Sequence, residues 1–521
     1  MNTPGLRALQ LSLVAAVLGF AWLRFSDNTA DNDLWGHVLY GQRYWNHGQV
    51  RETEQLSWTA TGFPVVNHEY LAEIVMGWVH RIAGGAGLFW YMLAMGSATV
   101  ALAFRGANAP PGTPRWTTWL LFAASINFIA LGFAVRPQLY TTLFLVVELI
   151  LLRQLAEGRR AAAFLLPPLF ALWINFHGGV LAGVLVVLIF AATETEHALR
   201  ARKAVAVWPW VLLICSVAAL FANPWGVDLI RWNVDAVRMP RPQIHEWQRM
   251  TLNAAHAPFY IVLVISALAR CFSRLPQRAW EAASLVMFAT MGILHQRHAP
   301  LFGLANLVLS SRHIDDAARR FASHAPGLVA ALARPAVQFS LSIALLAAGG
   351  RAIAVSFQSK EHPFTMEVER NVFPVAATEF MREHQLTGKT ITFFDWGQQN
   401  LWELPENPVS FDGRFDTGYP RKVIVAHWDF YAGKALRPEV NWNEAEVALL
   451  PTNCAGVPLL LHEGWRPVYR DPLAAVFVSP RGRHAAFRSG RPIERHEEEA
   501  TRGRVPFPDT PAVLATAAAS R

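Results

Sequence analysis

The sequence predicts an α-helical polytopic membrane protein with about eleven transmembrane helices and a small α/β domain at its C-terminal end. Of the 521 residues, 53% are hydrophobic and only 16% are charged, against roughly 25% charged residues in soluble domains. Apolar runs of about 17–25 residues recur between residues 6 and 355, which is typical of membrane-spanning helices. After residue 355 the chain becomes polar, and short strand patterns alternate with amphipathic helix patterns.

The first apolar run is read as an uncleaved span, because no small-x-small cleavage site precedes the polar loop that follows it. A run at 70–82 is short for a crossing and ends in a Gly-rich turn, so it is predicted to be a helix that lies in the membrane interface. The predicted spans lie at 6–25, 86–104, 116–133, 135–152, 162–176, 179–193, 205–221, 258–272, 279–295, 299–309 and 336–355.

Basic residues orient these spans. They gather in five loops, at 105–115, 153–160, 200–203, 270–278 and 312–334, and basic loops are preferentially cytoplasmic. The five loops alternate with the others only if 70–82 does not cross the membrane. The sequence therefore predicts a multi-pass membrane protein with a cytoplasmic N-terminus and with its C-terminal domain on the opposite side of the membrane. Nucleic acid is not expected as a partner, because the basic residues lie at span ends and do not form one patch.

Three domains are predicted from these patterns. Residues 1–355 form the transmembrane domain, within which 26–83 is a periplasmic catalytic loop that ends in the interfacial helix. Residues 356–480 form the α/β domain, with strand patterns at 389–396, 407–414, 445–451 and 473–479. Residues 481–521 are charged and lack periodicity, so they are predicted to be disordered.

The loop after the first span carries acids beside aromatic and imidazole side chains. It has more than 40 residues, which is long for a simple connector. Asp33 precedes an amphipathic helix pattern and is the preferred catalytic base, with Asp31 as an auxiliary group. Together Asp31 and Asp33 could also bind Mg²⁺ or Mn²⁺, since these cations prefer oxygen ligands. Alternatively both acids cap the helix that follows them.

Two further residues close this loop. His68 and Glu69 stand directly before the 70–82 helix. As functional residues they would position the acceptor or the leaving phosphate. As structural residues, Glu69 would favour the positive N-terminal end of the helix.

Ionisable residues also occur at span ends on the same predicted side. Guanidinium groups grip phosphate in a fork and imidazoles can donate hydrogen bonds to it, so this set is predicted to bind a substrate phosphate. Each member alone could instead be a helix cap or a snorkelling side chain. The set comprises Arg136, His177, Arg241, His245, Glu246, Arg297 and His298.

Several short motifs together resemble the GT-C superfamily of membrane glycosyltransferases, which includes the protein O-mannosyltransferases and the aminoarabinose transferase of lipid A. The resemblance covers roughly residues 6–480. It is carried by DNDLWGHVLYGQ, LSWTATGFPVVNHEYLAE, LWINFHGG, NPWG, IHEW and DWGQQNLWELPENPVSFDGR.

This resemblance implies a GT-C-like fold in the inner membrane of a bacterium, with the C-terminal domain in the periplasm. It also implies sugar transfer from a polyprenyl-phosphate donor on the outer side of that membrane, with an essential loop aspartate that Asp33 matches best. His68 stands where O-mannosyltransferases have the His of a His-Pro-Pro-Leu motif, but Glu69 and Tyr70 replace the prolines. Glu54 stands where a second aspartate is expected before the Ser-x-Thr stretch.

The predicted function is therefore transfer of a sugar from a polyprenyl-phosphate donor to a periplasmic acceptor, by direct displacement with an aspartate base. The expected partners are the lipid-linked sugar and membrane lipids, while the sugar and acceptor are left open. Two alternatives remain. An O-antigen ligase or polymerase would use the loop at 223–257. A non-enzymatic lipid or solute transporter would need charges and broken helices at mid-span, whereas here the charges cluster at span ends.

Overall fold

The computed structural model describes residues 3–107, 116–487, 492–495 and 500–509. Parts of the basic loop 105–115 and of the tail 481–521 therefore lie outside the described residues. The chain divides into two compact units. The helical unit comprises Met1–Asp27, Tyr91–Gly226 and Asn233–Lys360, and the mixed unit comprises Asn28–Trp90, Val227–Trp232 and Glu361–Arg521.

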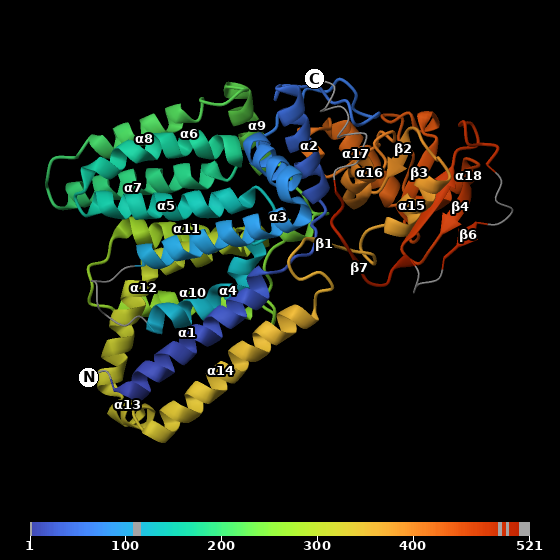
Figure 1. Cartoon of the computed structure of the whole chain (residues 1–521). Coiled ribbons are helices and arrows are strands. Elements are labelled where there is room, and N and C mark those ends of the chain that lie inside the picture. The colour runs from blue at the N-terminus through green and yellow to red at the C-terminus, as the bar shows by residue number, and fades with distance from the viewer. Residues whose placement is uncertain (1–2, 108–115, 488–491, 496–499, 510–521) are drawn as a thin grey trace. The chain divides into compact units, whose positions relative to one another are not determined.

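The helical unit contains all or part of thirteen α-helices and four short 3-10 helices among its described residues (Figure 1). They are α1 (Pro4–Phe25), the second half of α3 (Tyr70–Gly106), α4 (Trp116–Ile129), η1 (Ala130–Gly132), α5 (Gln138–Ala156), η2 (Arg160–Leu165), α6 (Leu166–Phe176), α7 (Val180–Arg200), α8 (Trp208–Ala219), the end of α9 (Val227–Arg238), η3 (His245–Trp247), α10 (Ala257–Phe272), α11 (Ala279–Leu294), η4 (Gln296–His298), α12 (Ala299–His324), α13 (Pro326–Leu332) and α14 (Pro335–Gln358).

Every predicted span falls on one or two of these helices. Five helices, α1, α3, α5, α7 and α14, are long and apolar enough to cross a membrane, and five shorter helical segments are also apolar. At the centre lies α12, whose first thirteen residues are all buried and which packs against α4, α5, α10 and α11. The predicted class, a polytopic helical membrane protein with a small α/β part, is confirmed.

A break divides α3 where the sequence ends its predicted interfacial helix. Ala83 and Gly84 depart from helical geometry, and Gly84 has a φ of +56°, in the region that favours glycine. The apolar segment 86–104 is thus a separate helical stretch from 70–82.

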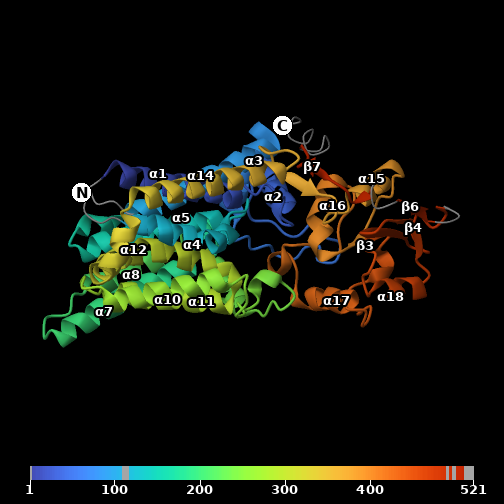
Figure 2. The same ribbon diagram turned by 90° about the horizontal axis from the view of Figure 1, so that it is seen from below.

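Helices α1 and α14 lie side by side along their length (Figures 1 and 2). Their closest approach is at two glycines. A Cβ atom at Gly19 would lie 2.6 Å from the carbonyl oxygen of Gly349, and one at Gly349 would lie 2.8 Å from the Cα of Ala16. Small residues at such a crossing let two membrane helices come close enough for backbone packing.

Replacing Gly349 by Ala should destabilise this helix pair, because the added methyl group would meet backbone atoms that cannot rotate away. We expect a cost of about 1–3 kcal/mol, measured as thermal unfolding of the purified protein in detergent. The matched control is Gly350→Ala in the same helix, where an added Cβ atom meets nothing within 4 Å. Equal stabilities of the two variants would contradict the packing argument.

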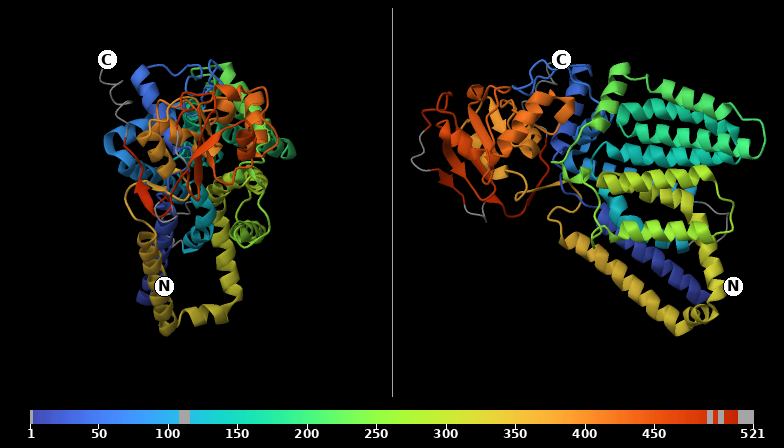
Figure 3. Two further views of the ribbon diagram at one scale, coloured as in Figure 1. Left: turned by 90° about the vertical axis from the view of Figure 1, so that its right-hand side faces the viewer. Right: turned by 180° about the vertical axis from the view of Figure 1, so that it is seen from behind.

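The mixed unit combines helices with two small sheets (Figures 1 and 3). Its elements are α2 (Leu34–His47), the first part of α3, the start of α9, β1 (Glu367–Glu369), α15 (Val375–Glu383), β2 (Thr390–Thr392), η5 (Phe394–Trp396), α16 (Gly397–Glu403), η6 (Phe415–Thr417), α17 (Arg421–Tyr431), η7 (Trp442–Glu444), β3 (Val447–Pro451), α18 (Val457–His462), β4 (Arg466–Arg470), β5 (Ala474–Val478), β6 (Ile493–Glu494) and β7 (Arg504–Pro506).

The larger sheet has the strand order β2-β3-β5-β4-β6. The β2/β3 and β4/β6 pairs are parallel, whereas β3/β5 and β4/β5 are antiparallel. Strand β5 is buried throughout and β3 nearly so, so these two apolar strands form the core of the sheet. In the smaller sheet β1 pairs antiparallel with β7.

The predicted strand at 407–414 is wrong for most of its length. Only Val409 forms isolated bridges, with Ser57 and Thr390, because the chain turns directly afterwards: the Asp412 carboxylate accepts a hydrogen bond from the Arg414 backbone N–H at 3.0 Å. The bridge to Ser57 joins the loop after the first span to the C-terminal part of the mixed unit.

Candidate functional site

Asp33 lies immediately before α2, the helix that its sequence position predicts. Its side chain forms no capping hydrogen bond with α2. Asp31 instead accepts a hydrogen bond from the Asp33 backbone N–H at 3.0 Å. The Asp33 carboxylate lies against Gly413, where a Cβ atom would be only 2.4 Å from its Oδ1. A larger residue at 413 would therefore displace Asp33.

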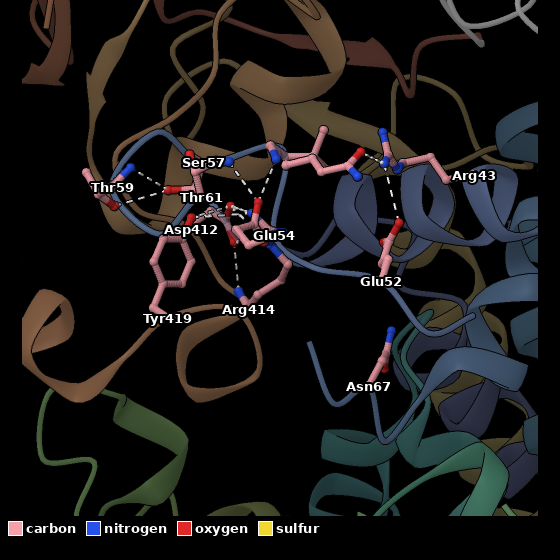
Figure 4. A network of polar contacts seen from close by, with 12 residues as sticks. Arg43, Glu52, Glu54, Ser57, Thr59, Thr61, Asn67, Asp412, Arg414 and Tyr419 are labelled. Carbon is pink, nitrogen blue, oxygen red and sulfur yellow. Dashed lines mark hydrogen bonds and ion pairs between the residues drawn. The ribbon is translucent and has the colours of Figure 1, made fainter. Parts of the chain in front are cut away.

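A buried ion network stands beside this carboxylate in the mixed unit (Figure 4). Arg414 donates to Glu54 and, through Nε, to the Asp412 Oδ1 at 2.9 Å. Glu54 also accepts from the backbone N–H groups of Leu56 and Ser57, at 2.6 and 2.7 Å. The Tyr419 hydroxyl donates to Asp412 at 2.8 Å. Glu54 is thus held as a structural anion within the loop.

The charge of Arg414 is fixed by this setting. Burial alone would lower the pKa of its guanidinium, but the neighbouring Asp412 and Glu54 carboxylates raise that pKa well above its ordinary value. Its guanidinium carbon also lies 5.1 Å from the centre of the Tyr40 ring on α2. The cation therefore links α2, the loop and the 412–414 turn.

A second cluster joins α2 to the first part of α3. The Nδ1 of His37 lies 3.1 Å from the Glu73 Oε1, and Asn67 donates to the other Glu73 oxygen at 2.5 Å. Glu69 lies 3.1 Å from the Nε2 of His68. The ligand atoms of His37, Glu69 and Glu73 all lie within 4.8 Å of one another, so these three residues could hold a metal ion.

This cluster depends on a close helix crossing. A Cβ atom at Gly41 would lie 1.8 Å from the Glu73 carbonyl oxygen, and one at Gly77 would lie 2.7 Å from the backbone N of Gln42. Only glycine at both positions lets α2 approach α3 this closely. The crossing brings His37 to Glu73 although 36 residues separate them.

His68 has a second neighbour in the mixed unit. Its ring stacks on Trp232 with centroids 4.1 Å apart and an interplanar angle of 27°. Trp232 belongs to the α9 segment that this unit contains. The stack fixes the plane of the imidazole while its Nε2 faces Glu69.

The protonation of His37 follows from its neighbours. Burial alone would lower its pKa, but the hydrogen bond to Glu73 and the charges of Glu69, Glu73 and Asp33 raise it from 6.5 to about 9. The imidazolium and the Glu73 carboxylate therefore form a buried ion pair at neutral pH.

Replacing His37 by Gln should remove stability in a pH-dependent way. Because the folded-state pKa exceeds the unfolded one, the contribution is complete below about pH 6.5 and is lost as pH rises through about 9. It should be on the order of 3 kcal/mol at most. Thermal unfolding from pH 6 to 10 checks this: the difference in stability between wild type and variant should disappear at high pH.

The control is His47→Gln, at an exposed position on the same helix, which should be as stable as the wild type at every pH. A loss of stability in His37→Gln that does not depend on pH would contradict the ion pair.

The helical unit holds a separate cluster on its predicted loop side. Arg136 and Arg297 each bind Glu246, at 2.9 and 3.0 Å. The guanidinium carbons of Arg241 and Arg297 lie 4.6 and 4.5 Å from the centre of the Trp247 ring. The three arginines thus contact one carboxylate, that of Glu246, or one indole ring, that of Trp247.

Histidines border this arginine cluster. The Nδ1 of His177 accepts from the Gly179 N–H at 3.0 Å and bonds Thr141 at 2.7 Å. Thr141 itself accepts from the Trp173 indole at 2.8 Å, so its hydroxyl donates to Nδ1 and the imidazole proton lies on Nε2. Burial and the adjacent Arg297 lower the pKa of His298, which is therefore neutral near pH 7.

The structure thus brings together Arg136, His177, Arg241, Glu246, Arg297 and His298 in the helical unit, and Asp31 with Asp33 and His68 with Glu69 in the mixed unit. His245 is exposed, and no hydrogen bond of its side chain is found within the described part of the chain. The residues that the sequence did not single out are His37, Glu73, Asp412, Arg414 and Trp232. The SFDGR motif contained Asp412 and Arg414, and its Asp-Gly-Arg turn was the available signal.

A solved structure similar to this chain is that of ArnT from Cupriavidus metallidurans bound to undecaprenyl phosphate. The similarity covers 90% of this chain and 97% of that one, with 13% sequence identity and a TM-score of 0.44. No protein-family model and no curated protein matches the chain. Similarity at this level assigns neither a reaction nor a ligand to this chain.

Proposed function

We propose that the protein is an inner-membrane glycosyltransferase of the GT-C type, which moves a sugar from a polyprenyl-phosphate donor to an acceptor on the periplasmic side. The observation that carries this is the gathering of Arg136, Arg241 and Arg297 around Glu246 and Trp247. Two guanidinium groups, of Arg136 and Arg297, bind the Glu246 carboxylate, and that of Arg241 lies over the Trp247 ring. Guanidinium groups gathered near the ends of apolar helices are suited to grip a lipid phosphate at the membrane surface.

The reaction would be a single displacement. The Asp33 carboxylate takes the proton of the acceptor hydroxyl, whose oxygen attacks the anomeric carbon of the sugar. The bond from that carbon to the phosphate oxygen breaks, and its electron pair leaves with the polyprenyl phosphate. Arg136 and Arg297 would stabilise the charge on the departing phosphate. Asp31 would hold the Asp33 backbone, as its hydrogen bond to the Asp33 N–H supports.

The predicted divalent cation stays a prediction, with Asp31 and Asp33 as its proposed ligands. His37, Glu69 and Glu73 are the described residues whose ligand atoms converge, and a set with one imidazole suits Mn²⁺ better than Mg²⁺. A cation there would supply positive charge near His68. No step of the proposed displacement depends on it.

Asp33→Asn should reduce transfer by at least about 100-fold, because the amide cannot accept the acceptor proton. The measurement uses membranes containing the full-length protein and polyprenyl-phosphate-linked sugars labelled in the sugar, with transfer of label as the readout. Asp27→Asn, an exposed acid of the same loop, should retain activity. Full activity of a folded Asp33→Asn protein would refute the assignment of the base.

Arg297→Gln should weaken binding of polyprenyl phosphate by about tenfold or more, since a charge-assisted hydrogen bond to phosphate is lost. Binding to the purified protein in detergent measures this. Arg249→Gln is the matched control, because Arg249 lies exposed in the same loop as Trp247. Equal losses in both variants would indicate a general electrostatic effect and would contradict a built phosphate site.

The ligase or polymerase alternative is favoured by one observation, namely that Arg241, Glu246 and Trp247 all belong to the 223–257 loop. Alanine at Arg241 and His245 distinguishes the two functions. If these changes abolish transfer while Asp33→Asn retains it, the 223–257 loop carries the reaction. The transporter alternative predicts uptake into proteoliposomes without a glycosyl product.

A further inference from the structure

The helical unit contains a second arginine cluster, at the other ends of α5 and α12. Arg153 lies about 22 Å along α5 from its first residue, Gln138, and Arg312 lies a similar distance along α12 from its start. This is about two thirds of the thickness of the hydrocarbon core of a bilayer, which is roughly 30 Å. The second cluster thus lies on the side where the sequence predicts the basic loops.

Four helices build this basic-side cluster around one carboxylate, Glu281, which is fully buried. Arg312 on α12 donates to both Glu281 oxygens, at 2.9 and 2.8 Å. Arg153 on α5 and Arg270 on α10 approach the same carboxylate at 3.6 and 3.7 Å, beyond normal hydrogen-bond distance. The Nε2 of the buried His313 lies 3.9 Å away.

The charges of the cluster do not balance. Three guanidinium groups share one carboxylate, so two positive charges remain uncompensated. The nearest acids of α12 are engaged elsewhere: Asp315 accepts from Thr117 and pairs with Arg319, while Asp316 accepts from Ser273. Burying unpaired charge is costly unless a counter-ion is present.

The donors of the cluster are also incompletely used. Arg153 is only 8% exposed, yet its Nε and Nη2 have no hydrogen-bond partner among the described residues. The same holds for the Nη2 of Arg270 and the Nε of Arg312. Arg278, at the rim, approaches one carboxylate among the described residues, that of Glu157, at 4.0 Å. These nitrogens surround Glu281 from separate helices.

We propose that this cluster binds the phosphate group of an anionic phospholipid in the leaflet on the basic-loop side. A phosphate would supply the missing negative charge and accept from the unpaired guanidinium nitrogens. The apolar helices that carry the arginines place the site at the depth of lipid headgroups, which favours a phospholipid over a free anion. The site would bind a lipid that stabilises the bundle, apart from the proposed donor site.

The test compares phospholipids bound by the full-length protein in nanodiscs. The wild type should retain phosphatidylglycerol over phosphatidylcholine in native mass spectrometry, and phosphatidylglycerol should raise its unfolding temperature. Arg312→Gln should bind phosphatidylglycerol about tenfold more weakly. Arg200→Gln is the control, because it removes the same charge from an exposed residue on the predicted basic side. No preference in the wild type, or equal losses in both variants, would overturn the proposal.

Two further measurements test the lipid site if Arg312→Gln does not fold. Glu281→Gln adds one uncompensated charge, so phosphatidylglycerol should stabilise this variant more than the wild type. Failure of that lipid to do so would show that the arginines only anchor Glu281. The second measurement uses inorganic phosphate at matched ionic strength. If it stabilises the protein in phosphatidylcholine as strongly as phosphatidylglycerol does, the ligand is a free anion and the lipid assignment is wrong.

Discussion

The mixed unit depends on the interactions of one buried cation, the guanidinium group of Arg414. It lies over Tyr40 of α2, bonds Glu54 of the loop and Asp412 of its own turn, and so joins three distant segments. A buried cation requires close anions and filled hydrogen bonds, and this one has both. Because the turn of Arg414 also contains Gly413, the same interaction sets the surface against which Asp33 rests.

In the helical unit, both arginine clusters contain more arginines than carboxylates. Glu246 receives two arginines and Glu281 receives one closely and two loosely. Arg414 is matched by two carboxylates, whereas in these clusters two or three arginines share one carboxylate. Ions that are fully paired stabilise one structure. A cluster with more positive than negative charges can instead attract an added anion. This difference in charge balance distinguishes the structural network around Arg414 from the two proposed phosphate-binding clusters.

The sequence could predict what depends on local patterns. Apolar runs located every span, and the Gly-rich end of 70–82 located the break at Ala83 and Gly84. It could not predict the pairing of His37 with Glu73 or of Glu54 with Arg414, which are 36 and 360 residues apart. Those contacts depend on the Gly41 crossing and on the fold of the C-terminal part. His245 was selected with its neighbours in the motif, yet the backbone turns its side chain outward.

The other acids near Asp33 in the mixed unit are held by ion pairs or hydrogen bonds. Glu54 is neutralised by Arg414, and Glu73 by the His37 imidazolium. Glu69 faces His68, and Asp31 accepts from the Asp33 backbone. A general base must be ionised and must reach its substrate, and the buried positions of Glu54 and Glu73 keep their carboxylates from an acceptor. Asp33 is half-buried at the start of α2, and its carboxylate lies against Gly413, where any side chain would displace it. The loop therefore uses its other acids to build the surface on which this one is presented.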